Sequence, residues 1–96
     1  MAADVTIYTT GYCGFCIRAK HLLGEKGIRY TEVDVEGRED LRSWLRKTTG
    51  QRTVPQVFIN GRSVGGYSDI AALDDAGELD PLLAQGAQPG AAPLPR

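Results

Sequence analysis

Two short segments of the chain alternate between apolar and polar residues, as strands with one buried face do. The first is Val5–Thr9, and the second covers residues 28–35. Between them, apolar side chains recur at spacings of three and four residues from Cys16 to Leu23, which predicts a helix over residues 15–26. A strand, a helix and a strand within about thirty residues predict a βαβ unit with parallel strands.

A second amphipathic helix is predicted after this unit. Leu41, Trp44, Leu45 and Thr48 stand at positions i, i+3, i+4 and i+7 and form one apolar face. Acidic residues stand near the start of the helix and basic residues near its end, as the helix dipole prefers. Gly50 is expected to end the helix. We expect Trp44 to be a packing residue on the apolar face.

A β-hairpin is predicted next, with strands at residues 57–59 and 62–64 joined by Asn60-Gly61. Asn-Gly is a strong hairpin signal because both residues tolerate positive φ. The predicted order is therefore βαβ, helix, hairpin and a further helix. We expect an α/β fold with a four-stranded mixed sheet and helices on both faces, with the Cys13 region at the carboxyl end of the first strand, where such sheets bind ligands.

The C-terminal part should hold two short helical segments and a tail. Ser68 is predicted to cap a helix that ends at Gly77, and Asp80 to cap a last turn with Pro81 at its first position. We expect the domain to span residues 1–85. Residues 86–96 contain mainly Gly, Ala, Pro and Gln and are predicted to form a flexible C-terminal tail.

Length and charge narrow the possible functions. Ninety-six residues suit a single domain, and the net charge of −1 gives no basic surface for nucleic acid. The apolar runs are too short for a membrane span, and no signal peptide is evident. We therefore expect a monomer in the reducing cytosol, with neither nucleic acid nor a membrane as partner.

The only two cysteines form the motif Cys13-Gly14-Phe15-Cys16, at a strand-to-helix turn. Unpaired N–H groups and the helix dipole favour a thiolate at Cys13, so the motif predicts thiol–disulfide exchange. A structural zinc site is a poor alternative because His21 is the only histidine. A purely structural disulfide would close a very short loop and would stabilise the fold only weakly. We expect no metal site within one chain.

Three motifs in this order resemble the glutaredoxins, most closely the bacterial dithiol type. They are the cysteine pair, Thr53-Val54-Pro55, and the run from Gly65 through Gly66, Tyr67 and Ser68 to Asp69. The resemblance implies a thioredoxin-like fold, a cis Val54–Pro55 bond and glutathione as reductant. It also implies catalytic roles for Cys13 and Cys16 and a glutathione site formed by Thr10, Phe15, Gln51, Thr53, Val54, Pro55, Gly66, Tyr67, Ser68 and Asp69.

The resemblance also implies how these residues act. Cys13 attacks the disulfide of a protein or of a glutathionylated protein, Cys16 resolves the mixed disulfide, and glutathione completes the cycle. The backbone of Val54 pairs with the cysteinyl part of glutathione, and Asp69 holds the γ-glutamyl ammonium. The residues alone leave two alternatives open: a trans Pro55 that starts a strand, and an Asp69 that only caps its helix.

The chain departs from the family pattern at three positions. Many members have, where Thr10 stands, a lysine that binds the glycyl carboxylate of glutathione, so this role should either fall on Gln51 or Arg52 or be weakened. The usual proline and tyrosine between the cysteines are replaced by Gly14 and Phe15.

These departures leave two further functions open. One is a dimer that binds a [2Fe–2S] cluster through Cys13 and glutathione. The other is a redoxin served by thioredoxin reductase, although such proteins carry Trp-Ser-Gly-Phe where this chain has Gly65-Gly66-Tyr67-Ser68.

Overall fold

The computed structural model describes residues 3–87 and 93–96 of the chain. Its four strands form one sheet in the order β2-β1-β3-β4, with β1 and β2 parallel and the other two pairs antiparallel. The predicted thioredoxin-like α/β fold with a mixed sheet is confirmed. The elements are β1 (Val5–Thr9), α1 (Gly14–Glu25), β2 (Tyr30–Asp34), α2 (Glu39–Thr49), β3 (Gln56–Ile59), β4 (Arg62–Gly65), α3 (Tyr67–Asp75) and α4 (Leu79–Ala84).

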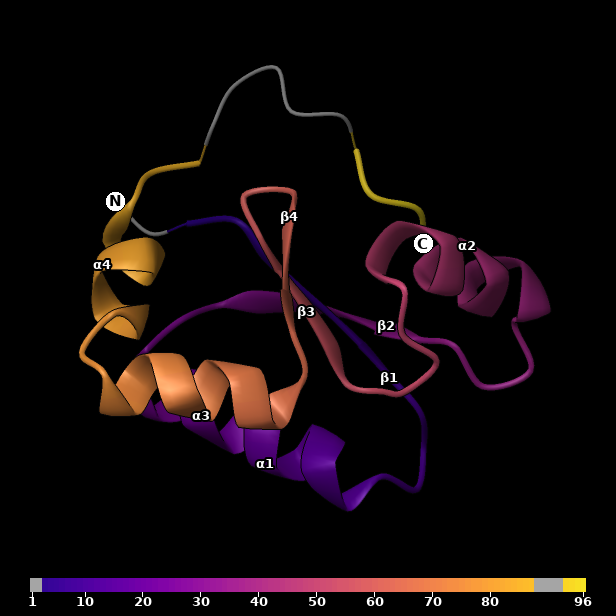
Figure 1. Ribbon diagram of the computed structural model, residues 1–96, viewed down its shortest axis with the longest axis horizontal. Helices are drawn as coiled ribbons and strands as arrows, with labels where there is room; N and C mark the ends of the chain where they lie inside the picture. The colour runs from indigo at the N-terminus through magenta and orange to yellow at the C-terminus, as the bar shows by residue number, and fades with distance from the viewer. Residues whose placement is uncertain (1–2, 88–92) are drawn as a thin grey trace.

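Helices cover both faces of the sheet (Figure 1). Side chains alternate along β1, so Ile7 belongs to one core cluster, with α1, α3 and α4, and Tyr8 to the other, with α2. Both clusters are apolar, and Ile7 and Tyr8 are fully buried. The central strand β1 is thus buried on both faces, which fixes its register against both neighbours.

The cluster under α2 is built around three aromatic rings. The centroids of Tyr8 and Trp44 lie 5.6 Å apart, and those of Trp44 and Phe58 lie 5.5 Å apart. Leu94 packs against this cluster, and the Tyr8 hydroxyl donates a 2.6 Å hydrogen bond to the carbonyl of Pro95. Burial raises the pKa of Tyr8 to about 12, against a smaller opposing effect of the Arg96 charge.

These contacts bear on the predicted flexible tail, residues 86–96. Residues 88–92 lie outside the described residues, whereas Leu94 and Pro95 contact the domain on the α2 side. The Arg96 carbonyl also accepts a hydrogen bond from Arg38. The domain boundary at residue 85 stays a prediction.

Most predicted turns are confirmed. Asn60 and Gly61 both have positive φ and join β3 to β4, and Gly50 ends α2 in the left-handed conformation. The strand predicted over residues 28–35 is shorter, Tyr30–Asp34. Among the described helices, none is long and apolar enough to cross a membrane.

Two predicted helix starts were wrong. Gly66, not Ser68, is the N-cap of α3, because Asp69 in the first turn accepts the N–H of Gly66 and fixes the helix start there. The last helix begins at Leu79, so neither Asp80 nor Pro81 has the predicted position.

Packing explains the earlier start of α4. Leu79 and Leu83 are buried in the core, and including Leu79 in the helix brings both side chains onto one face. The carboxylate of Asp80 lies instead 3.0 Å from Lys26 Nζ.

Candidate active site

Cys13 is the N-cap of α1, and its side chain meets the backbone of the first helical turn. The residue is extended, with φ −144° and ψ 106°, and its Sγ accepts a 3.0 Å hydrogen bond from the N–H of Cys16. The structure pairs the two sulfurs as a disulfide. Cys13 is half-buried whereas Cys16 is 1% exposed, so only Cys13 presents its sulfur to an incoming molecule.

The loop before β3 lies against Cys13. The Val54–Pro55 peptide bond is cis, as the resemblance implied, and the carbonyl oxygen of Val54 lies 3.7 Å from Cys13 Sγ. The antiparallel pairing of β1 with β3 brings Tyr8 opposite Gln56. The end of β1 and the start of β3 therefore lie at the same end of the sheet. This brings together the cysteine pair and the Val54–Pro55 loop, which are about forty residues apart in sequence.

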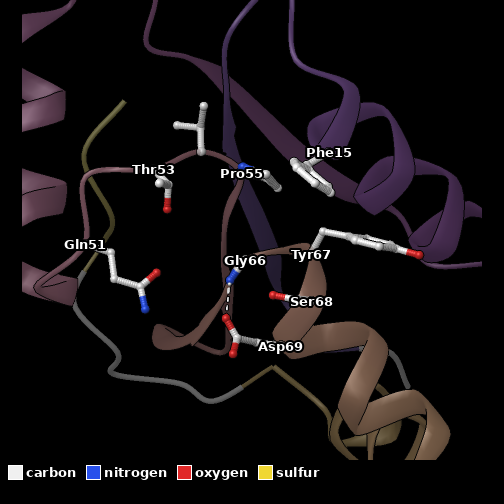
Figure 2. A pocket seen from close by; sticks show the side chains of 9 residues that line it. Phe15, Gln51, Thr53, Pro55, Gly66, Tyr67, Ser68 and Asp69 are labelled. Atoms are coloured by element: carbon white, nitrogen blue, oxygen red, sulfur yellow. Dashed lines mark hydrogen bonds between the residues drawn. The ribbon is translucent and has the colours of Figure 1, made fainter.

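A pocket of about 280 Å³ opens beside this loop (Figure 2). It collects nine of the ten residues that the sequence assigned to a glutathione site; Thr10, which is partly buried, is not one of those lining it. The lining residues are Phe15, Gln51, Thr53, Val54, Pro55, Gly66, Tyr67, Ser68 and Asp69.

One wall of the pocket is aromatic. The rings of Phe15 and Tyr67 stack with centroids 6.2 Å apart, and the guanidinium of Arg18 lies 5.6 Å from the Phe15 centroid. Phe15 is 59% exposed, which is unusual for so large an apolar side chain. Because the ring follows Cys13 by two residues, it can contact the molecule that is attached to that sulfur.

The other wall includes the start of α3, where backbone and carboxylate are packed closely. Asp69 Oδ2 accepts the N–H of Gly66 at 2.9 Å. Gly65 has φ +96°, and a Cβ there would collide with the Asp69 carboxylate. A Cβ on Gly66 would lie 3.1 Å from the carbonyl oxygen of Pro55. The two glycines therefore allow the helix to start directly beside the loop.

The first turn of α3 also supplies donors. Backbone N–H groups of the first helical turn have no partner within the helix, and in α3 this turn begins at Tyr67, on the pocket. Together with the helix dipole they favour an anion. The same end of the pocket carries the Asp69 carboxylate, so it offers both donors for a carboxylate and an acceptor for an ammonium.

The sequence prediction missed a buried polar residue behind the pocket. Gln56 is fully buried, and its Nε2 donates to Gln51 Oε1 at 3.0 Å and to the Thr53 carbonyl at 2.9 Å. The available signal was a glutamine directly before the apolar run that starts at Val57, since an amide is costly to bury without partners.

The positive side chains near the cysteines have other partners. Lys20 lies 3.0 Å from Glu32, which also accepts from Thr9. Burial tends to raise the pKa of Glu32, but the hydrogen bonds from Thr9 and Lys20 outweigh it and lower this pKa. His21 lies on the exposed surface beside Glu25. Within residues 3–87 and 93–96, no three His, Cys, Asp or Glu side chains gather as metal ligands.

The chain matches known proteins over most of its length. The family model that describes glutaredoxins matches residues 5–64. A glutaredoxin of Pseudomonas aeruginosa is 48% identical over 79 residues, 82% of this chain and 94% of that protein. Glutaredoxin 3 of Escherichia coli is 46% identical over 81 residues, 84% of this chain and 98% of that protein.

Solved structures agree with the sequence matches. A buckwheat glutaredoxin–glutathione complex has a TM-score of 0.79 at 34% identity and covers 84% of this chain and 76% of that one. The glutaredoxin of Brucella melitensis has a TM-score of 0.77 at 44% identity and covers 85% of this chain and 89% of that one. With its Cys13–Cys16 pair at the start of α1, the chain belongs to the glutaredoxin family and is a glutathione-dependent thiol–disulfide oxidoreductase of the dithiol type.

Proposed function

We propose that Cys13 is the attacking thiolate of this oxidoreductase and that Cys16 is the resolving thiol. The observation that carries this assignment is the difference in surroundings: Cys13 is half-buried at the helix start and accepts the N–H of Cys16, whereas Cys16 is 1% exposed. A backbone N–H that points at sulfur favours the thiolate over the thiol. A buried thiol can react only with a sulfur that is already attached next to it.

The proposed reaction is a sequence of exchanges. The Cys13 thiolate attacks one sulfur of a substrate disulfide, the substrate S–S bond breaks, and the other substrate sulfur leaves as a thiolate. On a protein disulfide, Cys16 then attacks Cys13, which releases the second substrate thiol and leaves the Cys13–Cys16 disulfide. Two molecules of glutathione reduce this disulfide and leave as glutathione disulfide. On a glutathionylated protein, Cys13 takes over the glutathione and releases the protein thiol. One further glutathione then attacks this adduct, frees Cys13 and leaves as glutathione disulfide.

Glutathione is proposed to lie in the pocket beside Cys13. The Val54 backbone next to the sulfur suits the extended cysteinyl part. The start of α3 suits the γ-glutamyl group, because N–H donors there can bind its carboxylate while Asp69 binds its ammonium. That the related buckwheat protein was solved as a glutathione complex supports this placement.

The partners follow from the same chemistry. We propose glutathione, disulfide-bearing proteins and glutathionylated proteins as partners, a monomer as the acting form, and the cytosol as the compartment, since a pool of reduced glutathione is required. The cluster-binding dimer and the redoxin served by thioredoxin reductase stay alternatives without an observation that favours them.

The assignment is tested with two single substitutions and two reductants. Cys13→Ser should abolish reduction of both protein disulfides and glutathionylated substrates. Cys16→Ser should abolish the first and keep the second, which needs one protein thiol plus glutathione. Each variant is assayed with glutathione and glutathione reductase, and in parallel with thioredoxin reductase. Substantial turnover by Cys13→Ser, or turnover only with thioredoxin reductase, contradicts the proposal.

A further inference from the structure

A buried glutamine behind the pocket donates a hydrogen bond to an exposed glutamine that lines the pocket. Gln56, the first residue of β3, uses both amide protons: one goes to Gln51 Oε1 and one to the backbone carbonyl of Thr53. Its own Oε1 is buried and has no hydrogen-bond partner among the described residues. An unpaired buried acceptor is unfavourable, so the two donated bonds must determine how this side chain is oriented.

The direction of these bonds follows from the backbone. A carbonyl oxygen can only accept, so Gln56 must present Nε2 and not Oε1 to Thr53. The second proton on the same nitrogen then needs an acceptor, which fixes Oε1 of Gln51 toward Gln56. Rotating the Gln56 amide by half a turn would bring its oxygen against two other oxygens. The Thr53 carbonyl thus fixes the orientation of the Gln56 amide, and the Gln56 amide in turn fixes that of Gln51.

This orientation determines what Gln51 offers to a ligand. An amide carries its oxygen and nitrogen on opposite sides, so once Oε1 faces Gln56, Nε2 faces away and can donate. Gln51 and Thr53 line the same pocket as Phe15 and Tyr67 and lie on its opposite side (Figure 2). With the other orientation, Gln51 would present an oxygen, which repels a carboxylate.

We propose that Gln56 is a positioning residue of the glutathione site, which acts by holding Gln51 so that its amide N–H groups are available to a carboxylate of glutathione. The inference rests on the proposed binding of glutathione in this pocket. Glutathione carries two carboxylates, and because the γ-glutamyl one is proposed to lie at the start of α3, the glycyl one is left to meet a donor on the opposite side of the pocket (Figure 2). A donor here adds to the binding of a carboxylate, because Asp69 contributes a negative charge to the pocket and Thr10, in place of a lysine, contributes no positive one.

The test measures an equilibrium in the Cys16→Ser background. There the Cys13 thiol exchanges with glutathione disulfide to give the Cys13–glutathione disulfide and one free glutathione, so the equilibrium constant reports how well the pocket binds the attached glutathione. Four proteins form a cycle: the parent, Gln51→Ala, Gln56→Met and the double variant. Methionine keeps the length of glutamine and also removes the unpaired oxygen, which limits the loss of stability.

We expect each single variant to lower the constant about ten-fold, the lower end for the loss of one hydrogen bond to a charged group, because Gln51 is exposed. The double variant should fall no further, because without Gln51 there is nothing for Gln56 to position. Independent effects, which would multiply to about a hundred-fold, overturn the inference. A parent-like constant for Gln56→Met also overturns it. Melting temperatures are measured for all four proteins. If the role of Gln56 is only structural, Gln56→Met should lower the melting temperature and the constant equally whether residue 51 is Gln or Ala.

Two further measurements sharpen the result. Repeating the cycle with the disulfide of glutathione monoethyl ester, whose glycyl carboxylate is masked, identifies the bound group. The effect of the glutamine variants should vanish, and an effect that persists contradicts binding of the glycyl carboxylate by Gln51. Gln51→Glu keeps an acceptor for Gln56 and replaces the outward donor by an oxygen, so it should weaken binding more than Gln51→Ala. Weakening no greater than in Gln51→Ala contradicts the role of Gln51 as donor.

A separate variant tests the proposed glutathione site independently of the two glutamines. Asp69→Asn in the same background probes glutathione binding at the other end of the pocket. If it has no effect and the glutamine variants have none, the proposed site is wrong. If it weakens the adduct while the glutamine cycle is additive, only this inference is wrong. Should Gln56→Met fail to fold, hydrogen exchange of the wild-type side-chain amides decides: both Gln56 protons should exchange slowly, and rapid exchange overturns the proposal.

Discussion

Asp69 has two separable tasks in the proposed site, and a pair of substitutions distinguishes them. Its Oδ2 accepts the N–H of Gly66 and so caps α3, and its charge is proposed to bind the γ-glutamyl ammonium of glutathione. Asp69→Asn keeps an oxygen that can accept from Gly66 and removes the charge. Asp69→Ala removes both. The difference between the variants therefore measures the cap, and the loss in Asp69→Asn measures the charge.

The structure gives a magnitude for each task. Loss of the hydrogen bond from Gly66 to Asp69 costs about 1 kcal/mol, which corresponds to about 4–8 °C in melting temperature for a domain of this size. Hydrogen bonds to charged groups contribute about 1.5–3 kcal/mol, and because Asp69 is exposed we take the lower end, about ten-fold in binding. We expect Asp69→Asn to melt close to the parent and to lose about ten-fold, and Asp69→Ala to show both losses.

The assay is the Cys13–glutathione exchange equilibrium in the Cys16→Ser background, read beside thermal unfolding. Reaction with 2-hydroxyethyl disulfide, which has neither ammonium nor carboxylate, serves as the control for sulfur reactivity and should be equal in all variants. An Asp69→Asn protein that binds glutathione as the parent does would refute the charge role and leave Asp69 as a cap only.

A neighbouring glycine tests the same carboxylate from the opposite side. Gly65→Ala puts a Cβ into the Asp69 carboxylate at a residue with φ +96°, so it should both lower the melting temperature and weaken the glutathione adduct. Gly24→Ala is the matched control, because it lies within α1 with nothing near its would-be Cβ. There alanine should stabilise by about 0.5–1 kcal/mol. Equal behaviour of the two variants would contradict the close packing described for α3.

Two further predictions concern the Cys13 thiolate and the core cluster under α2. Thr10→Lys should move the midpoint of Cys13 alkylation to lower pH and make it salt-dependent, since a lysine charge is screened; an unchanged midpoint speaks against a missing charge at this position. Tyr8→Phe removes the bond to Pro95 and should cost about 1 kcal/mol. Burial raises the pKa of Tyr8 to about 12, so the free energy of unfolding of the parent should fall as pH rises from about 10 to 12. Tyr8→Phe should lack this decline. Denaturant unfolding measures both proteins, and an equal decline in the two would contradict the prediction.

Features that depend on a few neighbouring residues were predictable from the sequence. Asn60-Gly61 forms the turn between β3 and β4 because both residues adopt positive φ, and Gly50 ends α2 for the same reason. The cysteine pair at a strand-to-helix turn is likewise a local pattern. Local conformational preference is enough to fix such features, so no knowledge of the packed structure is required.

Features that depend on packing were not predictable in this way. Ser68 is as good a capping residue as any, and only the close approach of Asp69 to Gly65 and Gly66 places the cap two residues earlier. The contact of Leu94 with the aromatic cluster could not be inferred from a tail composition that is poor in apolar residues. Each depends on which surface is nearby once the chain has folded.

The proposed site combines local features with features that depend on packing, and neither kind requires a lysine at position 10. The Cys16 N–H that meets Cys13 belongs to the local turn and is fixed once α1 forms. Recognition of the glutathione carboxylates, in contrast, is proposed to depend on donors that tertiary packing orients: the start of α3 beside Gly66, and Gln51 held by the buried Gln56. In the proposed site, reactivity at sulfur and affinity for glutathione thus rest on different residues, and substitutions should change one without the other.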